Sequence, residues 1–197
     1  MNWTKLVDRC TLMVDANKNL ILNLLYEAEE ELTRVCNVYE DEFIKTITVE
    51  SDVLDLPEET DGTNSFYKKA LVVLHNGVKL KAMHEYDFYY QTDNTKHAGT
   101  PIGYAIFNNK INFSHKLRVN DKVKVIYYGI VYDHTDYEPK IPSLYHKDLC
   151  HYACFMATIK DNPAVASSFM QLWNTSVSNI TLDEADRELI YTIREEV

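Results

Sequence analysis

Hydrophobic residues near the start of the chain recur every three or four positions, which is the period of a helix. From Trp3 to Val14 this spacing predicts an amphipathic helix that starts near Asn2. A second helix follows the turn "DANKN", and so short a turn favours an antiparallel αα-hairpin over residues 1–37. The predicted apolar stripe of the second helix is Ile21, Leu25, Ala28, Leu32 and Val35, with Glu27, Glu29, Glu30 and Glu31 facing elsewhere.

Residues 38–141 change to the alternating period of strands. Asn76-Gly77 and Asn108-Asn109 suit tight turns that need positive φ, so each pair predicts a β-hairpin. The longest strand is predicted in "DKVKVIYYGIVYD", residues 121–133. One face of this strand carries Val123, Val125, Tyr127, Gly129 and Val131.

Two further strands are predicted in this region, one from Phe43 to Glu50 and one in "EYDFYYQT", residues 85–92. The stretch around Pro57 and Asp61-Gly62 and the stretch "DNTKHAGTP" lack any period and are typical of loops. The middle of the chain therefore predicts an antiparallel sheet of about five or six strands.

The helical period returns after Pro142. Pro163 suits the first position of a second helix in this part. Thr181 and Glu184 match a capping box, which predicts a break near Asn179 and a separate C-terminal helix. The predicted buried stripe of the first of these helices is Leu149, Ala153 and Met156, with Cys150 and Cys154 beside it.

The helices at the two ends of the chain should pack together, because neither set can bury its apolar stripe alone. The predicted fold class is α+β. An N-terminal helical hairpin (1–37) and C-terminal helices (142–197) form a bundle, and an acidic loop and antiparallel β-sheet (38–141) are inserted between them.

The net charge of −10 is concentrated in one region. Between Glu27 and Asp61 there are 13 acids and two bases, whereas from Gly62 to Tyr132 there are ten bases and four acids. Such regions can be solvated surfaces, or they can meet between copies of the chain in head-to-tail association. An acidic surface repels the phosphate backbone and argues against a nucleic-acid-binding module.

No cofactor is expected, because the motifs of the common nucleotide-binding and hydrolytic sites are missing. No apolar run reaches the roughly 20 residues that span a bilayer, so no membrane contact is expected. His146, Cys150 and Cys154 share a helix face, but positions i to i+8 span roughly 12 Å, too far for three ligands of one metal ion. The four cysteines are expected to be reduced core residues: Cys10, Cys36, Cys150 and Cys154.

The sequence does not predict an enzyme. His134 lies between Asp133 and Asp136, where a carboxylate could orient a general base, but no nucleophile is identifiable nearby. Tyrosines in the strands could stack on nucleic-acid bases, although half-buried strands and protein interfaces also favour tyrosine. These tyrosines are Tyr86, Tyr89, Tyr90, Tyr104, Tyr127 and Tyr128.

Taken in order, these features resemble the head-to-tail adaptor (connector, or head-completion) proteins of tailed bacteriophages, particularly short-tailed phages. The resemblance rests on the helix pair "LVDRCTLMVDANKNLILNLLYEAEEELTRV" and on the strand series "GTPIGYAIFNNKINFSHKLRVNDKVKVIYYGIVYD". It is sharpest at "PKIPSLYHKDLCHYACFMA", where Ile-Pro, two residues and Tyr-His precede the helix. The acidic stretch 38–62 and the "DNTKHAGT" loop are also weakly similar to those of crAss-like phage ring proteins.

The resemblance implies a virion protein, assembled in the bacterial host cytoplasm as a ring of about twelve copies below the portal. The ring would extend the DNA channel without binding DNA specifically, and would join the portal to a tail or second ring protein. Its C-terminal segment "TLDEADRELIYTIREEV" would dock on the portal. Pro142, Tyr145 and His146 would have a structural role at the start of the helix. The family has no catalytic residues.

The acidic candidates have two open roles: they could face the channel and repel DNA, or face lysines of a neighbouring subunit. The alternatives to a ring are a monomeric or dimeric accessory module with one exposed apolar groove, such as a tail component or host-factor binder, and a small hydrolase using His134 or His146. The candidate channel or interface residues are Glu29, Glu30, Glu40, Glu42, Lys79, Lys81, Lys122 and Lys124, and the candidate portal-docking residues are Leu182, Leu189, Ile190 and Ile193.

Overall fold

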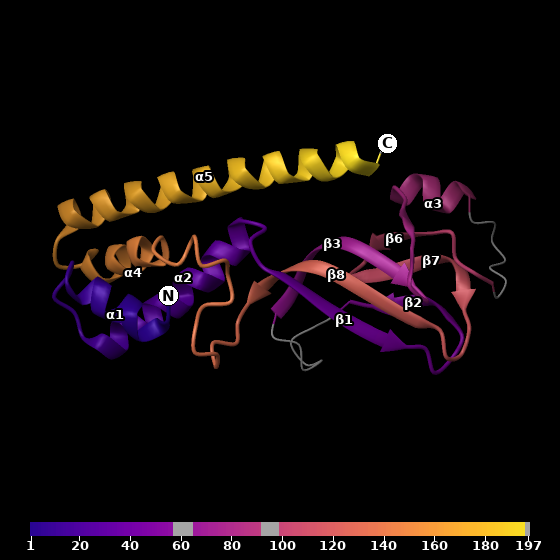
Figure 1. The fold of residues 1–197 in the computed structure, drawn as a ribbon, viewed down its shortest axis with the longest axis horizontal. Coiled ribbons are helices and arrows are strands. Elements are labelled where there is room, and N and C mark those ends of the chain that lie inside the picture. Colours follow the sequence, from indigo (N-terminus) through magenta and orange to yellow (C-terminus); the bar gives the residue numbers. More distant parts are fainter. Residues whose placement is uncertain (57–64, 92–98, 196–197) are drawn as a thin grey trace. The chain divides into compact units, whose positions relative to one another are not determined.

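The computed structural model describes residues 1–56, 65–91 and 99–195, with side chains described up to residue 89 in the second range and residue 185 in the third. The chain forms two compact units (Figure 1). The helical unit comprises Met1–Tyr39 and Gly129–Val197, and the β unit comprises Glu40–Tyr128. The predicted α+β class is confirmed. The predicted loops around Pro57 and Asp61-Gly62 and in "DNTKHAGTP" fall largely outside the described residues.

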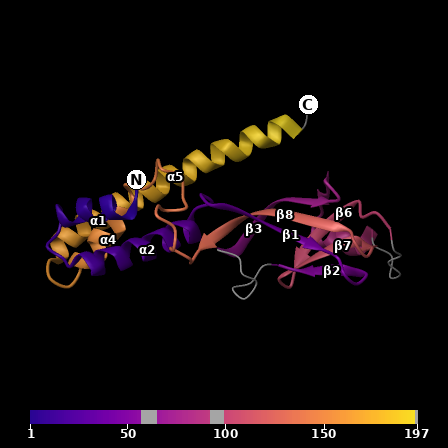
Figure 2. The ribbon, with the colours of Figure 1, turned by 60° about the horizontal axis from the view of Figure 1, so that its bottom comes forward.

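Four helices make up the helical unit: α1 (Trp3–Thr11), α2 (Lys18–Val35), α4 (Leu149–Thr158) and α5 (Pro163–Glu195). The side chains of Asn2 and Asn17 accept hydrogen bonds from the first-turn N–H groups of α1 and α2, which fixes where both helices begin. Helix α1 packs on α2 and α4, α2 also packs on α4, and α4 packs on α5 (Figure 2). The predicted helical hairpin therefore gains partners from the end of the chain.

The predicted stripe of α2 is largely confirmed, with two corrections. Ile21, Leu25, Ala28 and Leu32 are buried, but Val35, the last residue of the helix, is half exposed. Glu29 does not face away from the core, because its side chain is fully buried. Position 29 follows Leu25 by four residues, so it lies on the same side of the helix as Leu25.

The predicted break near Asn179 is wrong, because α5 is continuous from Pro163 to Glu195. Thr181 does not act as an N-cap: its hydroxyl donates to the carbonyl oxygen of Val177 within the helix, at 2.9 Å. Ile180 is buried in the core of the helical unit, which holds this turn of α5 in place. The predicted helix start at Pro163 is confirmed.

The β unit contains two four-stranded sheets rather than the single sheet expected from the sequence. Their inward-facing residues form one core, which includes Val125 and Tyr127 from the first sheet and Ile111 and Phe113 from the second, as in a β-sandwich. Most of the resolved pairings are antiparallel, but β5 and β6 are parallel. The first sheet has the order β1 (Glu40–Thr46), β8 (Lys122–Val131), β3 (Ser65–His75), β4 (Val78–Lys79), and the second has β2 (Ser51–Asp55), β7 (Lys110–Leu117), β6 (Gly103–Phe107), β5 (Lys81–Ala82).

Both predicted hairpin turns are confirmed, since Asn76, Gly77, Asn108 and Asn109 all have positive φ. The long strand β8 buries Val123, Val125, Tyr127, Gly129 and Val131 on one face, as predicted.

Two predicted strands differ from the structure. The strand expected from Phe43 to Glu50 ends early: residues 43–46 are the second half of β1, and residues 47–50 form the connection to β2. The stretch predicted as a strand at residues 85–92 forms the short helix α3 (Glu85–Gln91) instead. Helix α3 buries Phe88 against Phe107, with ring centroids 6.0 Å apart, and acidic residues in its first turn favour a helix start.

Candidate interaction surfaces

A buried carboxyl group organises the segment that links β8 to α4, residues 132–148. Glu29 of α2 accepts hydrogen bonds from the backbone N–H groups of Lys140 and Ile141, and from Nδ1 of His134 at 2.9 Å. The side chain of Glu29 has no solvent exposure, so these bonds replace the water that a carboxylate would otherwise bind. Glu29 is therefore an internal tether and cannot serve as a channel or interface residue.

Aromatic rings enclose the histidine of this tether. His134 stacks on Tyr26, with ring centroids 4.6 Å apart, and meets the edge of Trp3 at 6.0 Å. Trp3 Nε1 in turn donates to the carbonyl oxygen of Asp136 at 3.0 Å. The side chain of His134 is therefore packed and hydrogen-bonded as part of the fold, which does not favour the alternative of a hydrolase that uses this histidine.

Lys140 adds a charge to the same segment. Its ammonium lies 3.5 Å from Asp133 and 3.6 Å from Asp136, although the lysine side chain is largely buried. The N–H of Thr135 lowers the pKa of Asp133, and the nearby charge of Lys140 lowers it further. The sequence predicts neither the position of Lys140 nor the tethering role of Glu29, although the four-residue spacing of Glu29 from Leu25 is a signal for the latter.

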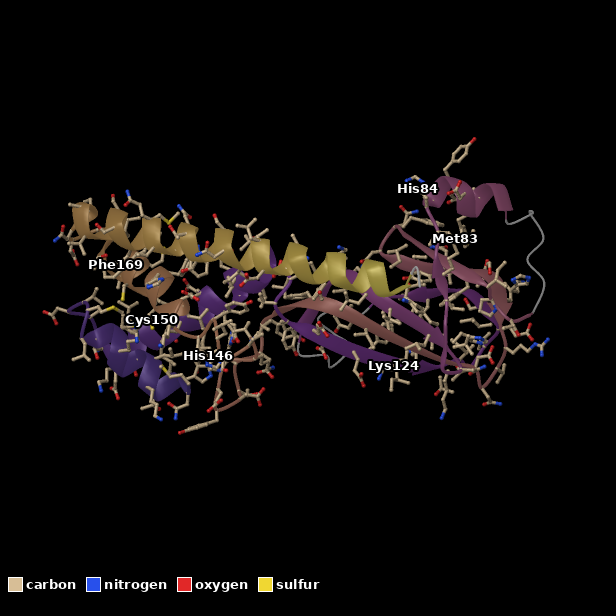
Figure 3. The ribbon with its side chains drawn as sticks, turned by 45° about the horizontal axis from the view of Figure 1, so that its top comes forward. Met83, His84, Lys124, His146, Cys150 and Phe169 are labelled. Carbon is tan, nitrogen blue, oxygen red and sulfur yellow. The ribbon has the colours of Figure 1, made fainter. Side chains whose placement is uncertain are left out.

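Two of the three candidate residues at the predicted start of the helix turn toward the core. The N–H of Tyr145 bonds to the carbonyl oxygen of Pro142 at 2.9 Å, which closes a turn. Tyr145 and His146 are buried, whereas Pro142 is exposed. His146 Nε2 lies 2.9 Å from the carbonyl oxygen of Ile141, and its Nδ1 lies 2.9 Å from that of Met1 (Figure 3).

Three cysteines meet where α1 packs on α4. Hydrogen bonds with Cys150 and Cys154, together with burial, raise the pKa of the Cys10 thiol. The hydrogen bond from Cys10 lowers the pKa of Cys150. All four cysteines of the chain are buried, and none of them forms a disulfide. Within the described residues, no cluster of histidine, cysteine and acidic side chains has a geometry that could hold a metal ion.

One edge of the β unit is acidic. We call it the acidic edge: strand β1, strand β2 and the connection between them, residues 40–55. It contains six acids and one base. Two of the acids bind lysines of the same chain, Asp55 to Lys110 at 2.8 Å and Glu42 to Lys124 at 2.5 Å. The acids of this edge are Glu40, Asp41, Glu42, Glu50, Asp52 and Asp55.

The other edge of the β unit is basic. We call it the basic edge: residues 78–82, which pass from β4 to β5 and carry Lys79 and Lys81 without any acid. Both lysines are exposed. The N–H of Lys81 bonds to the carbonyl oxygen of Ile102, which places exposed Ile102 beside this edge.

The structure separates the four candidate lysines into two pairs. Lys122 and Lys124 lie on β8, directly opposite Thr46 and Ile44 of β1, and therefore beside the acidic edge (Figure 3 marks Lys124). Lys124 is already paired with Glu42 of its own chain. Only Lys79 and Lys81 lie on the edge remote from β1, because the sheet order places β8 and β3 between β1 and β4.

A second acidic surface lies on the outward side of α2. We call it the acidic helix patch: Glu27, Glu30 and Glu31. Arg34 pairs with Glu30 at 2.5 Å and with Glu31 at 3.5 Å. Burial raises the pKa of Tyr152 on α4, and the charges of the three glutamates raise it further. The patch therefore keeps a net negative field despite Arg34.

Among the residues of α5 whose side chains the structure describes, Ile180 is the last that is buried in the core. Trp173 and Ile180 are its buried contacts with the core, and the Cys36 thiol lies 3.8 Å from the hydroxyl of Thr181. Leu182 is 66% exposed. The other candidate docking residues, Leu189, Ile190 and Ile193, have side chains outside the described residues, as does Tyr90. In the parts of the chain that the structure describes, no helix is both long and apolar enough to cross a membrane.

Comparison with known proteins identifies one family. The family model described as "SU10 adaptor protein" matches residues 1–193, which is nearly the whole chain and includes both units. No curated protein matches the sequence significantly.

Proposed function

The chain belongs to the SU10 adaptor protein family, and on this premise we propose that it is a virion protein that forms a ring between the portal and the tail. The family is one of structural phage adaptors rather than enzymes. The observation that carries the proposal is the family match over residues 1–193, which covers both the helical unit and the β unit.

The ring has about twelve copies, the number implied by the resemblance to head-to-tail adaptors, and it is assembled in the host cytoplasm. Each subunit needs a rigid body, because a ring closes only if successive interfaces repeat the same rotation. The buried tether of Glu29 supports this requirement. It joins α2 to the segment before α4 through three hydrogen bonds, so the helical unit cannot open there without exposing a buried carboxyl group.

The C-terminal part of α5 docks on the portal. Leu182 begins this part, two residues after Ile180, the last buried residue of α5 among those whose side chains are described. An exposed leucine on a helix can bury apolar area against a partner. Leu189, Ile190 and Ile193 continue the same apolar series in the sequence.

The acidic helix patch faces the DNA channel and keeps it free of strong binding. DNA must slide through such a channel, and negative side chains repel its phosphates. Negligible retention of double-stranded DNA at low salt is expected. Affinity that falls steeply with added salt would instead indicate a nucleic-acid-binding protein.

The test is the mass of the purified full chain in solution by light scattering, alone and with its cognate portal protein, at low and moderate salt. A closed ring, or a fixed number of copies captured by the portal, is the expected result. A monomer that ignores the portal under all these conditions contradicts the proposal and favours the accessory module.

A further inference from the structure

The two edges of the β unit carry opposite charge, and we propose that they form the contact between neighbouring subunits, acidic edge against basic edge. The occupant of each edge is therefore a second copy of this chain. The inference rests on the proposed ring and specifies which surfaces hold it together.

The two edges face away from each other because of the strand order. Strands β1 and β2 end their respective sheets on one side, and only residues 47–50 connect them. Strands β4 and β5 end the same two sheets on the other side, and only Leu80 connects them. A short connection keeps its two strands on one side of the sandwich, so each subunit presents one edge in each direction.

Charge that is not neutralised within the subunit remains at both edges. Within the described parts of the chain, Glu40 and Glu50 form no ion pair, and both are exposed. Lys81 is likewise exposed and, among the described residues, forms no ion pair. Complementary fields of this kind guide encounter and fix register between two surfaces.

Apolar side chains accompany the charges on both edges. Ile44 and Val49 are exposed on the acidic edge, and Val78 and Ile102 are exposed on or beside the basic edge. Protein interfaces commonly combine an apolar centre with a charged rim, and large exposed aliphatic side chains at a strand edge are a liability unless a partner covers them. Each edge therefore has both components of such a contact.

The distribution of charge also excludes a two-fold contact through either edge. Two acidic edges repel each other, as do two basic edges, so like edges do not pair. Acidic edge against basic edge is a heterologous contact, which closes into a ring or extends into a filament. This asymmetry is the property that a ring-forming subunit requires.

The test uses two charge-reversed variants, E40K/E50K on the acidic edge and K79E/K81E on the basic edge. Glu42 is left intact because its ion pair with Lys124 belongs to the fold. Each variant alone should lose ring formation, or ring capture by the portal, by at least about tenfold in assembled fraction. An equimolar mixture of the two should recover it, because the reversed charges of one variant can then face the reversed charges of the other.

The matched control for E40K/E50K is D15K/D161K, which makes the same change in charge in the turns that follow α1 and α4, and should assemble as the unchanged chain does. Circular dichroism establishes that every variant is folded. The edge contact is overturned if the folded single-edge variants assemble, or if their mixture recovers no assembly. In either case, a ring formed by the unchanged chain leaves the proposed function standing. Failure of the unchanged chain to assemble, alone and with the portal, overturns both.

Discussion

Glu29 and His134 are 105 residues apart in the sequence, yet Glu29 Oε2 lies 2.9 Å from His134 Nδ1 inside the helical unit. The contact brings the second helix together with the segment that follows the last strand. Because Glu29 also accepts two backbone N–H groups of that segment, one side chain determines how the chain returns from the β unit to the bundle.

Replacing Glu29 by Ala should therefore destabilise the protein by about 3–5 kcal/mol, since it leaves a largely buried histidine and two backbone N–H groups without their acceptor. The measurement is the free energy of unfolding in urea. Glu30→Ala is the matched control on the next residue. It removes a surface pair with Arg34 and should cost about 0–1 kcal/mol. Equal losses in the two variants would contradict the tether.

Asp121 connects two turns of the β unit. It accepts hydrogen bonds from Asn76 Nδ2 at 2.9 Å and from the N–H of Arg118 at 2.8 Å, and it pairs with His75 at 2.9 Å. Burial alone would raise the pKa of Asp121, but these bonds lower it below the ordinary value of 3.8. A carboxyl group with a lowered folded-state pKa adds stability above its unfolded pKa, and this stability is lost as pH falls through the folded value.

Asp121→Asn should accordingly cost about 1–3 kcal/mol at neutral pH. The difference between the two proteins should narrow once the pH falls below about 3.8, as urea unfolding at a series of pH values would show. Asp15→Asn, which changes an exposed aspartate in the turn after α1, is the control and should change the free energy of unfolding at neutral pH by less than about 0.5 kcal/mol. A difference that stays constant into acid would mean that Asp121 does not act through its charge.

The four thiols should react slowly with a disulfide reagent in the folded protein. All are buried, and the raised pKa of Cys10 keeps that residue in the unreactive thiol form. Reaction with Ellman's reagent should become fast only in denaturant, where four thiols per chain are titrated. A thiol that reacts rapidly before unfolding would place at least one cysteine at the surface.

Leu182→Glu should weaken capture by the portal at least about tenfold without changing the free energy of unfolding by more than about 0.5 kcal/mol, because the side chain is exposed in the subunit. Leu172→Glu, on the bundle-packed part of the same helix, is the control and is also at an exposed position. Surface plasmon resonance on immobilised portal compares the two. Identical losses in both would argue against docking by the end of α5.

The sequence predicts helices, strands and turns well where a single helical or alternating period, or a turn signal, dominates a stretch. The alternation in β8, the turns at Asn76-Gly77 and Asn108-Asn109 and the start of α5 at Pro163 all follow from residues within a few positions of one another. The strand predicted at residues 85–92 is a helix in the structure. Phe88 packs against Phe107, a distant residue in strand β6, and this contact outweighs the strand preference of the aromatic residues.

The candidate surfaces were harder to predict, because charge in the sequence does not reveal what a side chain faces. Glu29 and Glu40 belong to one acidic run, yet the first is buried and the second is exposed. Lys81 and Lys124 belong to one basic run but lie on different sides of the β unit, since β8 pairs with β1 across about 80 residues of chain. Strand order, which depends on non-local pairing, decides both cases.

Electron microscopy of the complex between the full chain and its cognate portal tests the central claim most directly. The expected image is a closed ring of this chain stacked on the portal, with an open channel along the shared axis and a uniform copy number. Single copies scattered around the portal, or a portal without added density at saturating chain, would contradict the account of this protein as a ring-forming adaptor.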